Sequence, residues 1–276
     1  MQSVPQAAIQ RAMAPLSAII LAAGKGTRMN SDLPKVAHEV AGKPMVRWVV
    51  EACAQAGCTR IVVVVGYGRE TVLKLLSGVR FDGVTIEYVD QTEQLGTGHA
   101  VMMAEPRFEQ SPAHDVFVLA GDGPLIRAAT LRTLLERHRT TAAAATLATA
   151  VIPDPAGYGR IDRDSAGRFL GIVEEKNASP EQKRIREVNP SYYCFESKAL
   201  FAALKGVERN PVSGEYYITD VPALLMASGR RVEVIEAVPP EDVLSINTPQ
   251  QLAEVDHILR ARATTDRSPA STARAN

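Results

Sequence analysis

A loop rich in glycine and basic residues follows the first apolar segment of the chain. It reads LAAGKGTRMNSDLPKV over residues 21–36 and contains the cations Lys25, Arg28 and Lys35. Glycines let a backbone approach an anion closely, and free N–H groups with nearby positive charge form an anion cradle. A P-loop needs a different glycine spacing, and the dinucleotide fingerprint would need a glycine at Met29. The loop is therefore predicted to bind phosphate groups, with a motif that is neither the P-loop nor the dinucleotide fingerprint.

Several polar residues farther along the chain could serve the same ligand. The amide of Gln91 offers both a hydrogen-bond donor and an acceptor to a polar ligand. Gly96 would let the backbone approach that ligand closely. Asp122 and Asn247 carry oxygen atoms next to predicted element ends. Taken singly, each of these residues could instead belong to an ordinary polar turn.

The elements that would position these residues alternate between strands and helices. Apolar segments predict strands at residues 16–22, 60–66, 84–89 and 115–121, and helical spacing predicts helices at 43–57, 70–78, 96–108 and 128–140. Continuous apolar strands separated by helices predict an α/β fold with a Rossmann-like, mainly parallel sheet covered on both faces. Ligands of such sheets bind at the carboxyl ends of the strands, where the basic loop lies.

The second half of the chain lacks the regular alternation of strands and helices. It predicts two strands within residues 157–176, a strand at 187–197, a helix at 216–229 and a strand at 231–238. Thr248, Pro249 and Gln251 predict a capping box at the start of the last helix. The expected organisation is a flexible segment at 1–14, one domain at 15–258 with parts near 15–150 and 151–245, and a disordered tail at 259–276.

A series of stretches in register resembles the sugar-1-phosphate nucleotidyltransferases. The resemblance is greatest to the uridylyltransferase domain of the bacterial bifunctional N-acetylglucosamine-1-phosphate uridylyltransferase, and it covers roughly residues 16–257. The stretches are LAAGKGTRM…LPKV, QTEQLGTGHAV, AGDGPLI, GYGRI, GIVEEKNA, EVN, GEYYITD and INTPQQL. The resemblance implies the nucleotide-diphospho-sugar transferase fold, a mixed sheet with a small β-rich lobe that binds the sugar.

The resemblance also implies roles for individual residues. Arg28, Lys35 and Asp122 would be catalytic, and Asp122 with Asn247 would hold Mg²⁺. The nucleotide would contact Leu21, Ala22, Ala23, Gly24, Lys35, Gln91, Gly96, Thr97, Ala120, Gly121 and Asp122. The sugar would contact Gly159, Glu174 and Asn189. His99 is interpreted as structural.

The implied reaction joins UTP and N-acetylglucosamine 1-phosphate to give UDP-N-acetylglucosamine and pyrophosphate. The same chemistry on another sugar 1-phosphate or nucleotide stays open, as does a non-catalytic sensor of sugar nucleotides. Pro190 and Ser191 follow Asn189 where the family usually has a small residue and glycine, so the identity of the sugar is the least defined part. The β-helix that transfers acetyl groups in the bifunctional proteins is not recognised in this sequence, so no acetyl-CoA is expected. A monomer or small homo-oligomer is expected.

Composition narrows the class of protein. The 276 residues include 31 basic and 31 acidic side chains, and this balance argues against a nucleic-acid partner. The three cysteines lack a metal-type pair and are interpreted as free thiols in a reducing compartment. Apolar segments are too short to cross a membrane, and the first residues lack the pattern of a signal peptide. A cytoplasmic protein without a membrane partner is expected.

Overall fold

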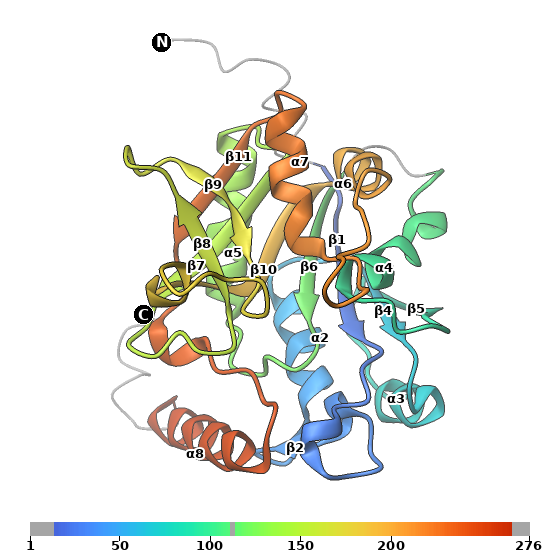
Figure 1. Cartoon of the computed structure of the whole chain (residues 1–276). Coiled ribbons are helices and arrows are strands. Elements are labelled where there is room, and N and C mark those ends of the chain that lie inside the picture. The colour runs from blue at the N-terminus through green and yellow to red at the C-terminus, as the bar shows by residue number, and fades with distance from the viewer. Residues whose placement is uncertain (1–13, 111–113, 267–276) are drawn as a thin grey trace, which may run out of the picture.

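The computed structural model describes residues 14–110 and 114–266, and its centre is a twisted sheet (Figure 1). The strand order is β11-β7-β10-β6-β1-β4-β5. The strands are β1 (Leu16–Ala22), β4 (Arg60–Val65), β5 (Thr85–Asp90), β6 (Asp115–Ala120), β7 (Ala145–Val151), β10 (Glu187–Glu196) and β11 (Val232–Glu236). A separate hairpin pairs β2 (Glu39–Val40) with β3 (Lys43–Pro44).

The sheet is mixed, as expected, because one strand runs against its neighbours. β1 pairs in parallel with β4 and β6, β4 with β5, and β7 with β11. β10 is antiparallel to both β6 and β7, between which it lies. β7 was not predicted from the sequence, since its alanines and threonines give neither a long apolar run nor a clear alternation.

Helices cover both faces of the sheet. One face carries α2 (Met45–Gln55), α3 (Arg69–Leu76) and α5 (Ala128–Thr140), and the other carries α4 (Thr97–Met102), α6 (Ser197–Leu204) and α7 (Val221–Ala227) (Figure 1). Strand β1 shows how the two-residue period divides the core: Ala18 and Ile20 pack on the α2 side, whereas Ile19 packs on the α4 side. The fold therefore confirms the prediction that helices cover both faces of the sheet.

The second half of the chain does not form a separate sheet. Strands β10 and β11 join the central sheet, so the boundary predicted near residue 150 does not divide it. Only the hairpin of β8 (Gly159–Arg163) and β9 (Phe169–Val173) extends away, and β8 pairs with the start of β10. Because Glu187 pairs with Val151, the segment 152–186 leaves and re-enters the sheet at adjacent positions.

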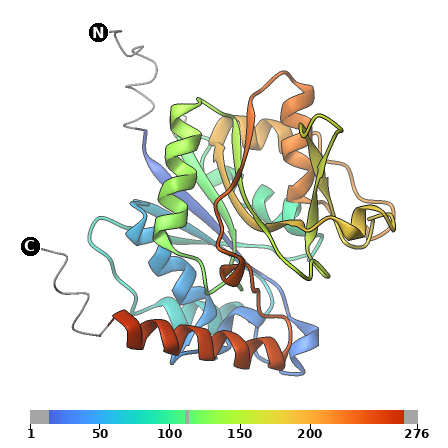
Figure 2. The same cartoon turned by 90° about the vertical axis from the view of Figure 1, so that its left-hand side faces the viewer.

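The last helix, α8 (Pro249–Asp266), crosses the base of the molecule beneath α2 (Figure 2). The expectation of a disordered tail from residue 259 is wrong for residues 259–266, which continue this helix. Leu259 is buried in a small core with Met45, and Arg262 forms an ion pair with Asp242. Residues 267–276, and residues 1–13 of the predicted flexible segment, lie outside the described residues.

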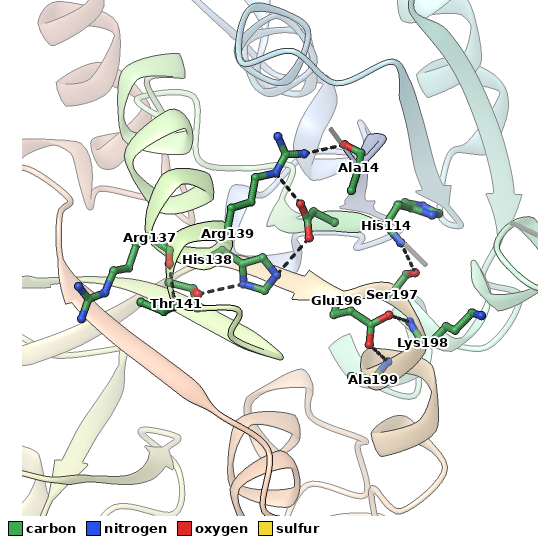
Figure 3. Close-up of polar contacts among 12 residues, drawn as sticks. Ala14, His114, Arg137, His138, Arg139, Thr141, Glu196, Ser197, Lys198 and Ala199 are labelled. Carbon is green, nitrogen blue, oxygen red and sulfur yellow. Dashed lines mark hydrogen bonds and ion pairs between the residues drawn. The ribbon is translucent and has the colours of Figure 1, made fainter. Parts of the chain in front are cut away.

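A buried polar cluster lies at the amino end of β6. His138 Nδ1 is 3.0 Å from Thr146 Oγ1, and its Nε2 is 3.4 Å from Asp115. Arg139 donates to Asp115 at 2.7 Å and to the carbonyl of Ala14, also at 2.7 Å (Figure 3). On the other side of β6, Ser197 at the start of α6 accepts from the N–H of His114 at 3.3 Å. These contacts hold the start of β1, the end of α5 and β6 together.

Cys53, Cys58 and Cys194 are all buried, and none of the three forms a disulfide, in agreement with the prediction that they are not cross-linked. Within the described part of the chain, every helix is too short or too polar to cross a membrane.

Candidate active site

The basic loop follows β1 at the carboxyl edge of the sheet and returns on itself. Two short 3₁₀ turns, Thr27–Met29 and Lys35–Ala37, shape it. Gly26 has a φ of 70°, and a Cβ at this position would lie 2.6 Å from the Cβ of Lys35. A side chain at residue 26 would therefore collide with Lys35. The glycine spacing thus serves to pack Lys35 against the loop.

Most of the predicted nucleotide residues surround one cavity of about 290 Å³. Its lining includes Leu21, Ala23, Gly24, Lys35, Gln91, Gly96, Thr97, Ala120 and Asp122. Ala22 and Gly121 are not part of this lining. The side chain of Ala22 packs into the core on the α2 side of β1, and a Cβ on Gly121 would lie 2.8 Å from the carbonyl oxygen of Leu21. Gly24 has open space where a Cβ would stand.

Gln91 lies buried in the wall of this cavity. Its Nε2 donates to the carbonyl of Gly96 at 3.0 Å and lies 3.1 Å from Nδ1 of His99. The amide nitrogen of Gln91 therefore already has partners within the protein. His99 is one of them, which agrees with the structural role predicted for it. Gly96 adopts a φ of 100°, and a Cβ there would lie 2.5 Å from the carbonyl oxygen of Tyr216. Packing against that backbone accounts for the glycine.

The predicted sugar residues surround a second cavity of about 390 Å³. Gly159, Glu174 and Asn189 all line it, together with Arg28 and Asn247. Three further lining residues also belong to the first cavity, namely Thr97, Ala120 and Asp122. The two cavities are therefore neighbours that meet at the end of β6. A larger cavity between α2 and α8 contains none of the predicted residues.

The junction of the two cavities concentrates the charged residues. Lys35 Nζ donates to Asp122 Oδ2 and, at 2.6 Å, to Asn247 Oδ1. Arg28 also donates to Asn247 Oδ1, at 2.8 Å. The backbone ties the two oxygen donors together, because the N–H of Ile246 donates to the carbonyl of Asp122 at 3.2 Å. Residues far apart in the sequence thus aim oxygen atoms at a common cation.

The donor set at this junction fits a hard cation such as Mg²⁺. A carboxylate and an amide oxygen already share one positive charge, the ammonium of Lys35. Mg²⁺ takes oxygen ligands and commonly uses few protein ligands beside waters and substrate phosphates. Among the described residues, no group of three or more His, Cys, Asp or Glu side chains could hold a metal by itself. Phosphate oxygens would have to complete the shell.

Two adjacent glutamates in the second part of the chain have different environments. Glu174 accepts a hydrogen bond from Thr219 Oγ1 at 2.9 Å, and its burial raises the pKa of the carboxyl. Glu175 instead forms an ion pair with the buried Arg160 at 2.6 Å. Burial acts to raise the pKa of Glu175 as well, but the hydrogen bonds from Arg160 and from the N–H of Gly157, together with the positive charges of Arg160 and Lys183, outweigh it, and the pKa is lowered. Glu174 faces the cavity, and Glu175 supports the structure.

A family model described as nucleotidyl transferase matches residues 17–239. The chain belongs to the nucleotidyl transferase family. It is 49% identical over 251 residues to the bifunctional protein GlmU of Pelotomaculum thermopropionicum, and 47% identical over 247 residues to that of Syntrophomonas wolfei. These alignments cover 91% and 90% of this chain but 53% and 54% of the relatives. The chain thus spans about half the length of the curated relatives that it matches.

The structure of this nucleotidyl transferase adds residues that the sequence analysis did not select. Thr219 holds Glu174, and Gln94 lines the first cavity. Of the predicted capping box, one contact is confirmed, because Thr248 Oγ1 accepts from the N–H of Gln251 at 3.3 Å. The reciprocal contact is displaced by one residue, because the Gln251 side chain accepts from the N–H of Asn247 at 2.8 Å. Thr219 belongs to the quoted stretch GEYYITD, which was the available signal. Lys25 is separated from the other cations, with its Nζ 5.1 Å from the ring centre of Tyr67.

Proposed function

We propose that this nucleotidyl transferase makes UDP-N-acetylglucosamine and pyrophosphate from UTP and N-acetylglucosamine 1-phosphate. The observation that carries the proposal is the pair of neighbouring cavities that meet at Asp122. The first would hold UTP and the second the sugar 1-phosphate, which brings the two phosphates to the cationic junction. The similarity to GlmU proteins supports the choice of substrates. A cytoplasmic location and the oligomeric state stay predictions.

The proposed chemistry is an in-line attack of the sugar phosphate oxygen on the α-phosphorus of UTP. A phosphate is already ionised at neutral pH, so no side-chain nucleophile is needed. Arg28 and Lys35 would neutralise the negative charge that develops on the phosphoryl oxygens and on pyrophosphate. Asp122 and Asn247 would hold Mg²⁺, which when bound supplies further charge neutralisation. The protein contributes mainly by positioning the substrates.

The base and the sugar would be recognised by hydrogen bonds at opposite ends of the site. Because the protein occupies the amide nitrogen of Gln91, its Oε1 is the group that would accept from N3–H of uracil. At the other end, Glu174 uses one oxygen for Thr219, and the second oxygen would accept from a sugar hydroxyl. Asn189 would donate its remaining amide hydrogen to the substrate.

A substrate panel tests the proposal. Pyrophosphate release would be measured with UTP, CTP, ATP, GTP and dTTP, each combined with four sugar 1-phosphates: N-acetylglucosamine, glucose, glucosamine and N-acetylgalactosamine. Turnover that is strongest for UTP with N-acetylglucosamine 1-phosphate is expected, and removal of divalent cations with EDTA should abolish it. Turnover with another pair would move the substrate assignment. A folded protein that binds UDP-sugar but releases no pyrophosphate would support the sensor instead.

A further inference from the structure

Arg160 is the largest of the almost completely buried side chains in the described residues, with 1% of its surface exposed. Its Nη2 lies 2.6 Å from Oε2 of Glu175, a side chain that keeps 33% of its surface exposed. The Nε of Arg160 is also buried and has no hydrogen-bond partner among the described residues. A buried charged side chain with an unused donor is uncommon in proteins and calls for a physical reason.

Stability alone is a poor reason for an ion pair of this kind. Removing a guanidinium from water opposes folding, and the attraction between the two charges does little more than offset this. Replacement of such a pair by apolar side chains of similar volume is often neutral or stabilising. The pair between Arg160 and Glu175 is therefore expected to do something other than raise the free energy of unfolding.

Arg160 lies at the end of the β8–β9 hairpin that meets the cavity proposed for the sugar 1-phosphate. In this hairpin it pairs with Val173. The residues next to this pair are Gly159, just before Arg160, and Glu174, just after Val173, and both line the cavity. The side chain of Arg160 is thus anchored beside two residues that are proposed to contact the sugar.

Hydrogen bonds from Arg160 connect the turn before β8 with the segment after β9. Its Nη1 donates to the carbonyl of Tyr158, and its Nη2 donates to Oε2 of Glu175 at 2.6 Å. The same Oε2 accepts from the N–H of Gly157 at 3.1 Å. Nη2 also donates to the carbonyl of Lys183 at 3.5 Å. One guanidinium and one carboxylate therefore tie together two segments that meet at the cavity.

The turn before β8 has a backbone that benefits from such a support. Residues 156–159 line the cavity, and they include Gly157, with a φ of 86°, and Gly159. Glycine loses more conformational freedom than other residues when its backbone becomes ordered. A turn that is already held in place has lost this freedom before the ligand arrives, so the ligand binds more tightly.

We propose that Arg160 is a positioning residue for the acceptor, which holds the turn before β8 and the segment after β9 in the arrangement that binds the sugar 1-phosphate. The proposal rests on the proposed function and deepens it. Arg160 is not part of the cavity lining and acts through Glu175 and the carbonyl of Tyr158. The first cavity takes none of its lining from these two segments, so nucleotide binding should not depend on Arg160.

Three variants and a matched control separate positioning from stability. Arg160→Met removes the guanidinium, the double variant Arg160→Met/Glu175→Met removes both charges and leaves neither unpaired, and Arg160→Lys keeps a charge with fewer donors. The control is Arg163→Met. Arg163 lies on the same strand and forms an ion pair with Glu187 at 2.7 Å, but neither of these two residues lines either cavity.

The measurement is kcat/KM for N-acetylglucosamine 1-phosphate with saturating UTP, together with the KM for UTP. Arg160→Met should lower this kcat/KM by about tenfold or more, since small displacements of positioning groups have effects of this size, and should leave the KM for UTP unchanged. The double variant should show the same fall, with a urea midpoint that is not below that of Arg160→Met. Arg160→Lys should recover part of the loss. Arg163→Met should keep the wild-type kcat/KM, whatever its urea midpoint.

A wild-type kcat/KM for the acceptor in Arg160→Met or in the double variant would overturn the proposal. So would an equal fall in Arg163→Met, or a rise in the KM for UTP that matches the loss for the acceptor. Failure of the proposed function has a different signature, since wild-type protein would then release no pyrophosphate with any sugar. Calorimetry with UDP-N-acetylglucosamine and with UTP then makes the same comparison. Arg160→Met should raise only the Kd of the UDP-sugar, and equal shifts or none would again overturn the role of Arg160.

Discussion

At the scale of single residues, Lys35 occupies the position that we propose for a divalent cation. Its ammonium bonds the oxygens of Asp122 and Asn247, and it is mostly buried, with 16% of the side chain exposed. A bound Mg²⁺ would compete for the same two oxygens, so Lys35 would have to turn toward the substrate phosphates. Lysine suits this exchange because its ammonium is a compact charge on a flexible stem.

Replacing Lys35 by methionine should therefore separate metal binding from catalysis. Without the competing ammonium, Lys35→Met should bind Mn²⁺ more tightly than wild type in the absence of nucleotide, measured by electron paramagnetic resonance. Turnover should fall by about 100-fold or more, since a charge that stabilises the transition state is lost. Lys74→Met, which removes an exposed lysine on α3, serves as the control for net charge. Weaker Mn²⁺ binding in Lys35→Met would contradict the exchange.

The raised pKa of Glu174 predicts how acceptor binding depends on pH. Because burial raises this pKa, the carboxylate takes up a proton at a higher pH than a free glutamate does. If the ionised form binds the sugar, the KM for the sugar 1-phosphate should rise as the pH falls through this pKa. Glu174→Gln should have a high KM that is flat with pH, whereas Glu175→Gln should keep the wild-type pH dependence. An unchanged KM in Glu174→Gln would remove Glu174 from the sugar site.

The chemistry of the site residues could be predicted from the sequence more readily than the residues that each of them contacts. The chemistry of the basic loop followed from its glycines and cations, but it was the resemblance to the family, and not a local pattern, that separated Lys35, which faces the site, from Lys25, which faces Tyr67. One oxygen of Glu174 accepts from Thr219, and the amide nitrogen of Gln91 contacts Gly96 and His99, and only the folded chain brings these partners close. Long-range hydrogen bonds of this kind leave no local pattern.

At the scale of elements, helix α8 anchors the segment that presents Asn247. Asp242, almost completely buried at the start of this segment, forms ion pairs with Arg127 at the start of α5 and with Arg262 on α8. Arg262 lies near the C-terminal end of α8, whereas Asn247 lies just before its first residue. The ion pair between Asp242 and Arg262 thus links the start of the 242–247 segment to the far end of the helix that follows it.

Breaking this contact should loosen both ends of the loop. Arg262→Met leaves a buried carboxylate with fewer partners and should lower the free energy of unfolding by about 1–3 kcal/mol, measured with urea. Hydrogen exchange along α8 and residues 242–247 should become faster. Arg260→Met is the matched control, because Arg260 is exposed and pairs only within α8, so about 0.5 kcal/mol or less is expected. Equal effects from the two variants would argue against a specific anchor.

The sequence predicted most elements of the Rossmann-like half but not the direction of β10. An apolar run shows that a strand is buried, and it does not show whether the strand runs parallel or antiparallel to its neighbours. Helix α6 was also missed, because SKALFAAL is short and follows the strand without a break. The end of α8 was missed because Arg262 is held by Asp242, which lies 20 residues earlier in the chain and outside the helix. No local pattern in the sequence marks such a pair.

At the scale of the whole molecule, the two edges of the sheet differ in role. The carboxyl edge carries the candidate site, and the opposite edge carries the cluster of Asp115, His138 and Arg139. Burial acts to raise the pKa of Asp115, but hydrogen bonds from His138 and Arg139 outweigh it, so this pKa is lowered. Asp115 therefore stabilises the fold above the pKa of about 3.9 that it has when unfolded, and this contribution is lost as the pH falls through the lower folded value.

The cluster predicts acid sensitivity that can be assigned to one residue. Asp115→Asn should be less stable than wild type near pH 6, and the difference should shrink as the pH falls below about 4. Urea unfolding of both proteins between pH 2.5 and pH 6 measures this difference. A gap that stays constant over the whole range would show that the charge of Asp115 is not what stabilises the fold.

The adjacent exit and entry points of segment 152–186 have a consequence for how such a protein can be altered. Val151 and Glu187 are paired neighbours, so lengthening or exchanging the intervening stretch requires no change of register in the seven strands of the sheet order. The stretch carries Gly159 and Glu174 and none of the residues that line the first cavity. The part of the proposed acceptor site that this stretch carries can therefore be exchanged with that of a relative without altering the lining of the first cavity.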